Sequence, residues 1–129
     1  MEAYQSDTII GSRPGSGIVG VWAMFNLLGI EGYIAIAKKI MELTKAMRDG
    51  MHAIPGLKLL SESRLNMVTA YSDQHEFHRV VEDLEKKGWG FFPLSEPPGL
   101  TVLLDPDNDG QVELFLADLK NAMRLRVPS

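Results

Sequence analysis

The sequence contains no cysteine. That absence excludes a disulfide framework, a thiolate nucleophile and a zinc site built on cysteine, and it is typical of a cytoplasmic protein. An excess of positive charge is also missing, because 13 lysine and arginine residues stand against 17 aspartate and glutamate residues, for a formal net charge of −4. This balance leaves no electrostatic footprint for nucleic acid or for an anionic membrane.

A long uninterrupted apolar run is absent as well. The longest apolar stretch, residues 18–30, is broken by Gly20, Asn26 and Gly29 and is shorter than the roughly 20 residues that a bilayer helix needs. Residues 1–8 include acids and lack the apolar core of a secretory signal. We therefore expect no membrane partner, no nucleic-acid partner and a cytoplasmic location.

What the sequence does contain is ordinary for a globular protein. Apolar residues make up 45% and charged residues 23% of its 129 positions, which is enough for one folded domain with a core. Residues 1–17 are polar and rich in glycine, serine and proline, and they predict an arm and a loop. Residues 18–129 are predicted to form the folded domain.

Two helices are expected first. Residues 18–28 are apolar on almost every side, which predicts a helix buried all round, covered by something large. Residues 31–52 place apolar side chains near helical spacing with charged ones opposite, and the Ile54-Pro55-Gly56 sequence ends this second helix.

The rest of the chain alternates short strands and helices. Asp73 is a plausible N-cap for the first helix of this part, and Gly88 a plausible C-terminal end. The expected strands are 57–60, 66–71, 89–94 and 100–104, and the expected helices are 74–87 and 110–125. An arm and two helices followed by ββαββα predict an α+β fold whose mainly antiparallel sheet is covered on one face.

A dinucleotide-binding pattern, G-x-G-x-x-G, occurs at residues 15–20. That fingerprint needs a strand before it and a βαβ unit around it, whereas two helices are expected here before any strand. We therefore interpret these glycines as part of the loop and helix start.

The run Asp105-Pro106-Asp107-Asn108-Asp109-Gly110 is similar to the opening of a calcium loop. Its twelfth position should be glutamate but is Leu116, and a strand precedes it where a helix should. A polar turn that caps the final helix is the better interpretation.

His75, His78 and Glu82 share one face of a predicted helix at a spacing that could hold a metal. No other acid or histidine cluster completes the ligand shell, so a solvated helix face is the better interpretation. No G-x-S-x-G, H-E-x-x-H or P-loop sequence is present. The residues alone assign no catalytic residue and no metal site.

Several segments, in order, carry a resemblance to a known family. They begin with Y-Q-S-D-T-I-I-G-S-R-P-G at residues 4–15, Trp22-Ala23 and L-G-I-E-G-Y at residues 28–33, and they continue with I-P-G-L at 54–57, N-M-V at 66–68 and K-K-G-W at 86–89. Together they resemble the region after the cofactor lysine in the group II pyridoxal-phosphate decarboxylase superfamily. Sphingosine phosphate lyases and archaeal tyrosine/aspartate decarboxylases are the most similar members, and the resemblance covers nearly the whole chain.

The resemblance implies the C-terminal small domain of a fold-type I enzyme that is usually a dimer. In that family a large domain carries the Schiff-base lysine, which follows a histidine, and the aspartate that pairs with the pyridine nitrogen of pyridoxal phosphate. No lysine of this chain follows a histidine. We therefore expect the chain to need a large cofactor-binding domain or chain as partner, to form a homo-oligomer, and by itself to be inactive and to hold no cofactor tightly.

The resemblance also implies cofactor-binding residues in the loop before the first helix. Gly11 would allow close approach of the backbone, Ser12 would supply a hydroxyl, and Arg13 would supply a positive charge for a phosphate or carboxylate. The alternative is that Arg13-Pro14 only shapes the entry to the helix.

One position departs from the family pattern. The amino-acid decarboxylases have an arginine that grips the substrate α-carboxylate in the strand matching residues 99–104, and here the matching position is Thr101. A hydroxyl cannot replace that bidentate contact. Thr101 is therefore our candidate substrate-binding residue, for a substrate without an α-carboxylate, such as a phosphorylated amino alcohol cleaved to an aldehyde. The alternative function is a non-catalytic α+β module that binds a small molecule or a partner chain.

Overall fold

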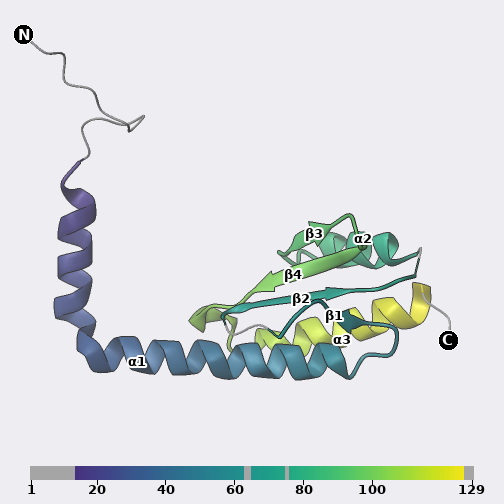
Figure 1. Cartoon of the computed structure of the whole chain (residues 1–129), viewed down its shortest axis with the longest axis horizontal. Helices are drawn as coiled ribbons and strands as arrows, with labels where there is room; N and C mark the ends of the chain where they lie inside the picture. Colours follow the sequence, from purple (N-terminus) through teal and green to yellow (C-terminus); the bar gives the residue numbers. More distant parts are fainter. Residues whose placement is uncertain (1–13, 63–64, 75, 127–129) are drawn as a thin grey trace, which may run out of the picture. The chain divides into compact units, whose positions relative to one another are not determined.

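The computed structural model describes residues 14–62, 65–74 and 76–126 (Figure 1). The chain divides into two compact units, Met1–Ala35 and Ile36–Ser129. The first unit consists, in its described part, of one helical segment. The second contains the sheet, two further helices and the hydrophobic core.

Helix α1, Ser16–His52, runs from the first unit into the second. Its backbone leaves helical geometry at Gly29, where φ is 59° and ψ is −176°, so two helices meet there at a kink. Positive φ at this point favours glycine, which has no Cβ to clash with the following carbonyl. The two helices predicted from the sequence are confirmed, with the break between them at Gly29.

In the helical segment of the first unit, the apolar side chains that we predicted to be buried are exposed. Ile18, Trp22 and Leu27 are 78%, 67% and 77% exposed. Phe25 and Tyr33 contact each other, with ring centroids 5.1 Å apart. The burial predicted for residues 18–28 is therefore not supplied by the residues that the structure describes.

The length and apolarity of α1 also bear on the expectation that no segment spans a membrane. By length and composition alone this helix could cross one. The sequence argument stopped at Ile30, whereas α1 resumes after the kink at Gly29 and includes further apolar residues such as Ile34 and Ala37. Buried core helices of soluble proteins meet the same criterion, so the property does not by itself assign a membrane location.

Four strands form one sheet in the second unit, in the order β1-β2-β4-β3. They are β1 Lys58–Leu59, β2 Met67–Tyr71, β3 Phe92–Leu94 and β4 Gly99–Leu103, and every pairing is antiparallel. The predicted antiparallel sheet is confirmed, although β1 and β3 are shorter than their apolar runs suggested.

Helix α2, Phe77–Lys86, and helix α3, Gln111–Arg126, confirm the remaining two predicted helices. Asp73 is not the N-cap of α2; that position is Glu76, which makes no side-chain cap, and Asp73 pairs with Lys58 instead. The prediction failed because an acid close to a helix start can equally satisfy a lysine on a neighbouring strand. Gly88 does follow the end of α2, with φ 85° and its N–H donating to the Glu85 carbonyl at 2.9 Å.

The core lies on one face of the sheet. Val68 and Ala70 of β2 and Leu100 and Val102 of β4 are buried at 0 to 7% exposure. The helices add further buried side chains over them: Leu43, Met47, Met51, Phe77, Val80, Leu84, Val112, Phe115, Leu119 and Met123. Helices therefore cover this one face of the sheet, as predicted.

Candidate functional site

The three residues proposed to contact the cofactor, Gly11, Ser12 and Arg13, lie outside the described residues. Their role stays a prediction. Gly17 and Gly20 of this pattern lie within α1, and the next element described after α1 is β1, so the short strand–turn–helix–strand unit of a dinucleotide fingerprint is not described here.

Thr101 lies in the middle of β4. Its register partners are Thr69 of β2 on one side and Phe92 of β3 on the other. The hydroxyl oxygens of Thr69 and Thr101 are 2.9 Å apart, so one hydroxyl donates to the other. Because directly paired residues point to the same side of a sheet, Thr69, Phe92 and Thr101 share the face opposite the core.

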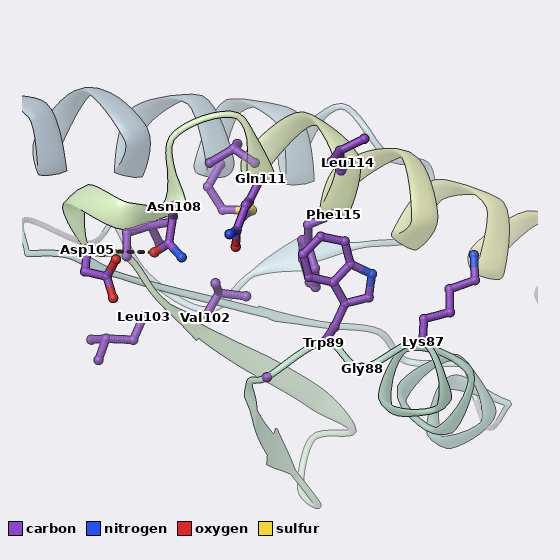
Figure 2. Close-up of a pocket in the computed structure, with 14 residues that line it drawn as sticks. Lys87, Gly88, Trp89, Val102, Leu103, Asp105, Asn108, Gln111, Leu114 and Phe115 are labelled. Carbon is purple, nitrogen blue, oxygen red and sulfur yellow. Dashed lines mark hydrogen bonds between the residues drawn. The ribbon is translucent and has the colours of Figure 1, made fainter.

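A cavity of about 610 Å³ opens beside the end of β4 (Figure 2). Its apolar lining includes Met47, Val102 and Phe115, and its polar lining includes Asn108 and Gln111. Figure 2 shows Trp89 beside Phe115 and Lys87 at the far side of the turn that leaves α2. A cavity with an apolar lining and a few polar groups can hold a small molecule.

One wall of the cavity is fixed by a single carboxylate, Asp118 of α3. The Lys87 ammonium donates to one of its oxygens at 2.6 Å and the Trp89 indole N–H donates to the other at 2.9 Å. The Lys87 hydrogen bond, followed by that of Trp89, lowers the pKa of Asp118 below its ordinary value. Trp89 also packs edge-on against Phe115 with centroids 5.3 Å apart, so the turn after α2 is held against α3.

The Asp105 loop is a cap, as predicted, although the helix that it caps is a different one. Asp105 accepts from the Asp107 N–H at 2.9 Å and donates its own N–H to the Asn108 side chain at 2.8 Å. This capping box opens the 3-10 helix Pro106–Asn108 and not α3. The sequence argument missed the short helix because it treated the whole run as one turn.

No group of three potential metal-ligating side chains occurs among the residues that the structure describes. His75 lies outside them, so the interpretation of His75, His78 and Glu82 as a solvated helix face stays a prediction.

The described lysines do not form an enclosed site for a covalently bound cofactor. Five of them pair with aspartates across partly exposed contacts: Lys39 with Asp109, Lys45 with Asp49, Lys58 with Asp73, Lys86 with Asp83 and Lys87 with Asp118. A Schiff-base lysine needs a desolvated amine, whereas these five side chains lie in partly exposed ion pairs. The described residues therefore do not fit the lysine side of a pyridoxal-phosphate site.

Comparison with known proteins gives consistent matches over almost the whole chain, although no family model matches it. The sphingosine-1-phosphate lyase of Oryza sativa subsp. japonica is 35% identical over 93% of this chain and 22% of its own length. The sphingosine-1-phosphate lyase of Dictyostelium discoideum is 34% identical over 95% of this chain and 23% of its own length. A probable L-aspartate decarboxylase of Thermococcus gammatolerans is 38% identical over 91% and 30%, respectively.

The solved structures agree. A sphingosine-1-phosphate lyase of Burkholderia pseudomallei K96243 matches with a TM-score of 0.83 and 32% identity, over 94% of this chain and 28% of that one. The cystine C-S lyase C-DES matches with a TM-score of 0.65 at 16% identity, which shows the fold alone.

The match to the Burkholderia lyase shows that this chain forms an α+β domain. In that lyase the same fold is part of a longer chain. The sphingosine-1-phosphate lyases and the archaeal aspartate and tyrosine/aspartate decarboxylases are homologues of this chain, and they match most of its length. The chain spans 22 to 30% of the length of the three relatives named above. The family resemblance inferred from the sequence is confirmed.

The sequence argument did not anticipate the cavity or the Asp118 contacts. The segment Gly88-Trp89-Gly90 was a usable signal, because a tryptophan between two glycines in a tight turn needs something to pack on. Its partners, Phe115 and Asp118, are more than 20 residues away in the sequence, and no local pattern joins them.

Proposed function

We propose that this chain serves as the C-terminal small domain of a pyridoxal-phosphate-dependent carbon–carbon lyase or decarboxylase of the sphingosine-phosphate-lyase type. The observation that carries the proposal is the match to one segment of the rice and Burkholderia lyases, each over more than nine tenths of this chain. The chain would complete the enzyme and would be inactive without the large domain.

The division of labour follows from the residues. The described lysines pair with aspartates or lie on the surface, so the cofactor-binding lysine would come from the large domain. When bound, pyridoxal phosphate supplies the electron sink for breaking a bond to the amine-bearing carbon. Gly11, Ser12 and Arg13 would contribute backbone approach, a hydroxyl and a positive charge toward an oxyanion at that site.

For the substrate we propose a phosphorylated amino alcohol. Thr101 offers a neutral hydroxyl that is already hydrogen-bonded to Thr69, so this pair cannot form the bidentate ionic contact of an arginine with an α-carboxylate. Cleavage of such an amino alcohol would break the carbon–carbon bond between the amine-bearing and the hydroxyl-bearing carbon. Loss of the hydroxyl proton would release the hydroxyl-bearing carbon as an aldehyde, and the bonding electron pair would stay with the amine-bearing carbon, which would then take up a proton.

For its setting we propose a cytoplasmic homo-oligomer. The excess of acidic over basic residues and the lack of cysteine support the cytoplasmic location. The exposed apolar side chains of the first unit, such as Trp22 and Leu27, support association with further protein. Sedimentation of the chain at rising concentration should show self-association, and a single monomeric species throughout would count against it.

A chimeric enzyme tests the main proposal. This chain would replace the matching segment of the Burkholderia lyase, whose solved structure fixes the junctions. We expect the chimera to release an aldehyde from a phosphorylated amino alcohol and no carbon dioxide from aspartate or tyrosine. Carbon dioxide without aldehyde would overturn the substrate class, and a folded chimera with neither product would overturn the function.

Two variants of the chimera test whether Arg13 contributes to activity. Arg13→Gln should lower kcat/KM by about tenfold to a hundredfold if the guanidinium contacts an oxyanion, whereas Arg13→Lys should keep part of the activity. Equal activity of both variants and the parent would favour the alternative, that this residue only shapes the helix entry.

A second candidate, a non-catalytic module that binds a small molecule, is favoured by the 610 Å³ cavity beside Trp89 and Phe115. It predicts that the isolated chain binds a compound of that size. A ligand screen by thermal shift, with Gln111→Leu as the variant that should lose binding, separates the two candidates.

A further inference from the structure

The cavity beside the end of β4 has an aromatic wall that is fixed in place. Trp89 donates its indole N–H to Asp118 at 2.9 Å and packs edge-on against Phe115, with ring centroids 5.3 Å apart. Both rings line the cavity of about 610 Å³. Because a hydrogen bond and a ring contact hold the indole, it offers a rigid apolar surface to a ligand.

Gly90 leaves the cavity open next to this wall. It lines the cavity, it is not among the described glycines with positive φ, and a Cβ added to it would have no atom within 4 Å. Neither the backbone conformation nor packing against the described residues therefore requires glycine at this position. The missing side chain provides free space beside Trp89.

The charged groups that line the cavity are not balanced. The ammonium group of Lys87 donates to Asp118 at 2.6 Å and is thereby paired. The carboxylate of Asp105 accepts from the Asp107 N–H at 2.9 Å, and no lysine or arginine among the described residues forms an ion pair with it. This carboxylate attracts a cation and repels an anion that enters the cavity.

Two side-chain amides complete the polar part of the lining. Figure 2 shows Asn108 and Gln111 between Asp105 and Trp89. The Asn108 side-chain oxygen accepts the Asp105 N–H at 2.8 Å, so this amide is held next to the carboxylate. The amide oxygen of Gln111 can accept a hydrogen bond from an ammonium group. The cavity therefore has a polar, acidic end and an aromatic end.

We propose that this cavity binds a small organic amine, with its ammonium group at Asp105 and its apolar body against Trp89 and Phe115. This inference rests on the second candidate function, binding of a small molecule in the cavity, and adds to it the chemical class of the ligand. An amine with an apolar body matches both ends of the cavity. A carboxylic acid of the same size would bring like charges together, and an alcohol would match the aromatic end without the ionic contact.

Three compounds that share a phenylethyl group test this class of ligand. At neutral pH phenethylamine is a cation, phenethyl alcohol is uncharged and hydrocinnamate is an anion. Each would be titrated into the isotope-labelled isolated chain, and NMR would follow the amide and indole N–H signals. The chain has two tryptophans, so the indole N–H of Trp89 reports on the cavity and that of Trp22 on non-specific contact. Trp22→Phe assigns the two signals.

We expect phenethylamine to shift the signals of Trp89 and Gly90 saturably, with a Kd in the low millimolar range, and to leave Trp22 unchanged. Phenethyl alcohol should bind about threefold to tenfold more weakly, and hydrocinnamate more weakly still. Equal affinities for the three compounds would overturn the amine class and leave the second candidate function standing. No shift at Trp89 or Gly90 with any of them would also overturn the amine class, while the ligand screen described above decides the second candidate function by itself.

Two substitutions of carboxylates separate a direct contact from the effect of net charge. Asp105→Asn removes the charge and keeps an oxygen for the Asp107 N–H, since asparagine is also a good N-cap. Glu113→Gln removes the same charge from an exposed position of α3 outside the cavity lining. Asp105→Asn should weaken the binding of phenethylamine by about threefold to tenfold and leave phenethyl alcohol unchanged, whereas Glu113→Gln should change neither. Equal weakening by both variants would overturn the proposed position of the ammonium group.

Gly90→Val fills the free space beside Trp89. Because a Cβ at this position has no atom within 4 Å, the unfolding temperature should stay unchanged. The affinity for phenethylamine should fall by about tenfold or more, since the added side chain occupies the volume of the ligand. Full affinity in a folded Gly90→Val chain would place the ligand outside this cavity and overturn the proposal.

Discussion

The two arms of α1, residues 16–28 and 30–52, both contain many apolar residues, and they differ in how far these residues are buried. Before Gly29 the apolar side chains point in every direction, and Ile18 and Trp22 are 78% and 67% exposed. In the arm after Gly29, Leu43, Met47 and Met51 follow helical spacing and are 0 to 8% exposed within the core of the second unit. Apolar content thus indicates that a side chain is suited to burial, but only one-sided periodicity indicates that its own chain buries it.

The largest effect on stability should come from truncating a side chain in the hydrophobic core. Leu119→Ala removes a fully buried side chain of α3 and should lower the free energy of unfolding by about 2–5 kcal/mol. Leu27→Ala, in the first arm of α1, removes the same atoms from a side chain that is 77% exposed. This variant should change the free energy of unfolding by less than about 0.5 kcal/mol. Urea unfolding of both variants measures the contrast, and equal losses would show that the first arm is buried in the isolated chain.

A smaller effect is expected at Gly99. A Cβ there would lie 2.6 Å from the Ala70 carbonyl oxygen, so β4 could not keep its distance from β2. Gly99→Ala should lower the free energy of unfolding by about 1–3 kcal/mol. Gly20→Ala, with no atom within 4 Å of its Cβ, is the matched control in the first arm and should leave the unfolding of the sheet unchanged. A tolerant Gly99 would mean that the two strands pair less closely than described.

A smaller effect still is expected from the hydrogen-bonded hydroxyls of Thr69 and Thr101 on the sheet face opposite the core. Thr69→Val keeps the shape of the side chain and removes its hydrogen bond to Thr101, for an expected loss of about 0.5–1.5 kcal/mol. Thr69→Ser retains the hydroxyl and should lose less of that interaction. Thermal unfolding of the isolated chain compares the stability of the two variants. If the serine variant is no more stable than the valine variant, the hydrogen bond does not contribute to stability.

The smallest effect concerns pH. Hydrogen bonds from Lys87 and then Trp89 lower the pKa of Asp118 in the folded chain. A carboxyl whose folded pKa is lowered contributes stability above its unfolded pKa, and that contribution is lost as pH falls through the folded value. The unfolding midpoint of the parent should therefore fall on acidification below about pH 4, and Asp118→Asn should fall less. Parallel curves for both proteins would exclude a contribution from this pair, whose partly exposed geometry keeps it small.

Much of the second unit could be predicted from sequence, because its elements are marked by local patterns. The strands and helices follow from alternation, helical spacing and the turn residues Pro55 and Gly88, each of which acts on its neighbours in the chain. The N-cap assigned to Asp73 failed because its partner, Lys58, lies 15 residues away on a strand. The Asp118 contacts and the cavity beside them were missed for the same reason.

The candidate site residues also differ in how far the sequence could place them. Thr101 was placed on its strand, and the structure adds that its hydroxyl already pairs with Thr69. Gly11, Ser12 and Arg13 were proposed from resemblance alone and lie outside the described residues. What covers the apolar side chains before Gly29 could not be predicted, because the described residues leave them exposed.

The most direct test of the central claim is borohydride reduction in the presence of pyridoxal phosphate, followed by peptide mass mapping, for the isolated chain and the chimera side by side. The account predicts one specific adduct in the chimera, on a lysine of the Burkholderia portion, and no specific adduct anywhere in this chain. A stoichiometric adduct on one of the seven lysines present here, at positions 38, 39, 45, 58, 86, 87 and 120, would contradict it.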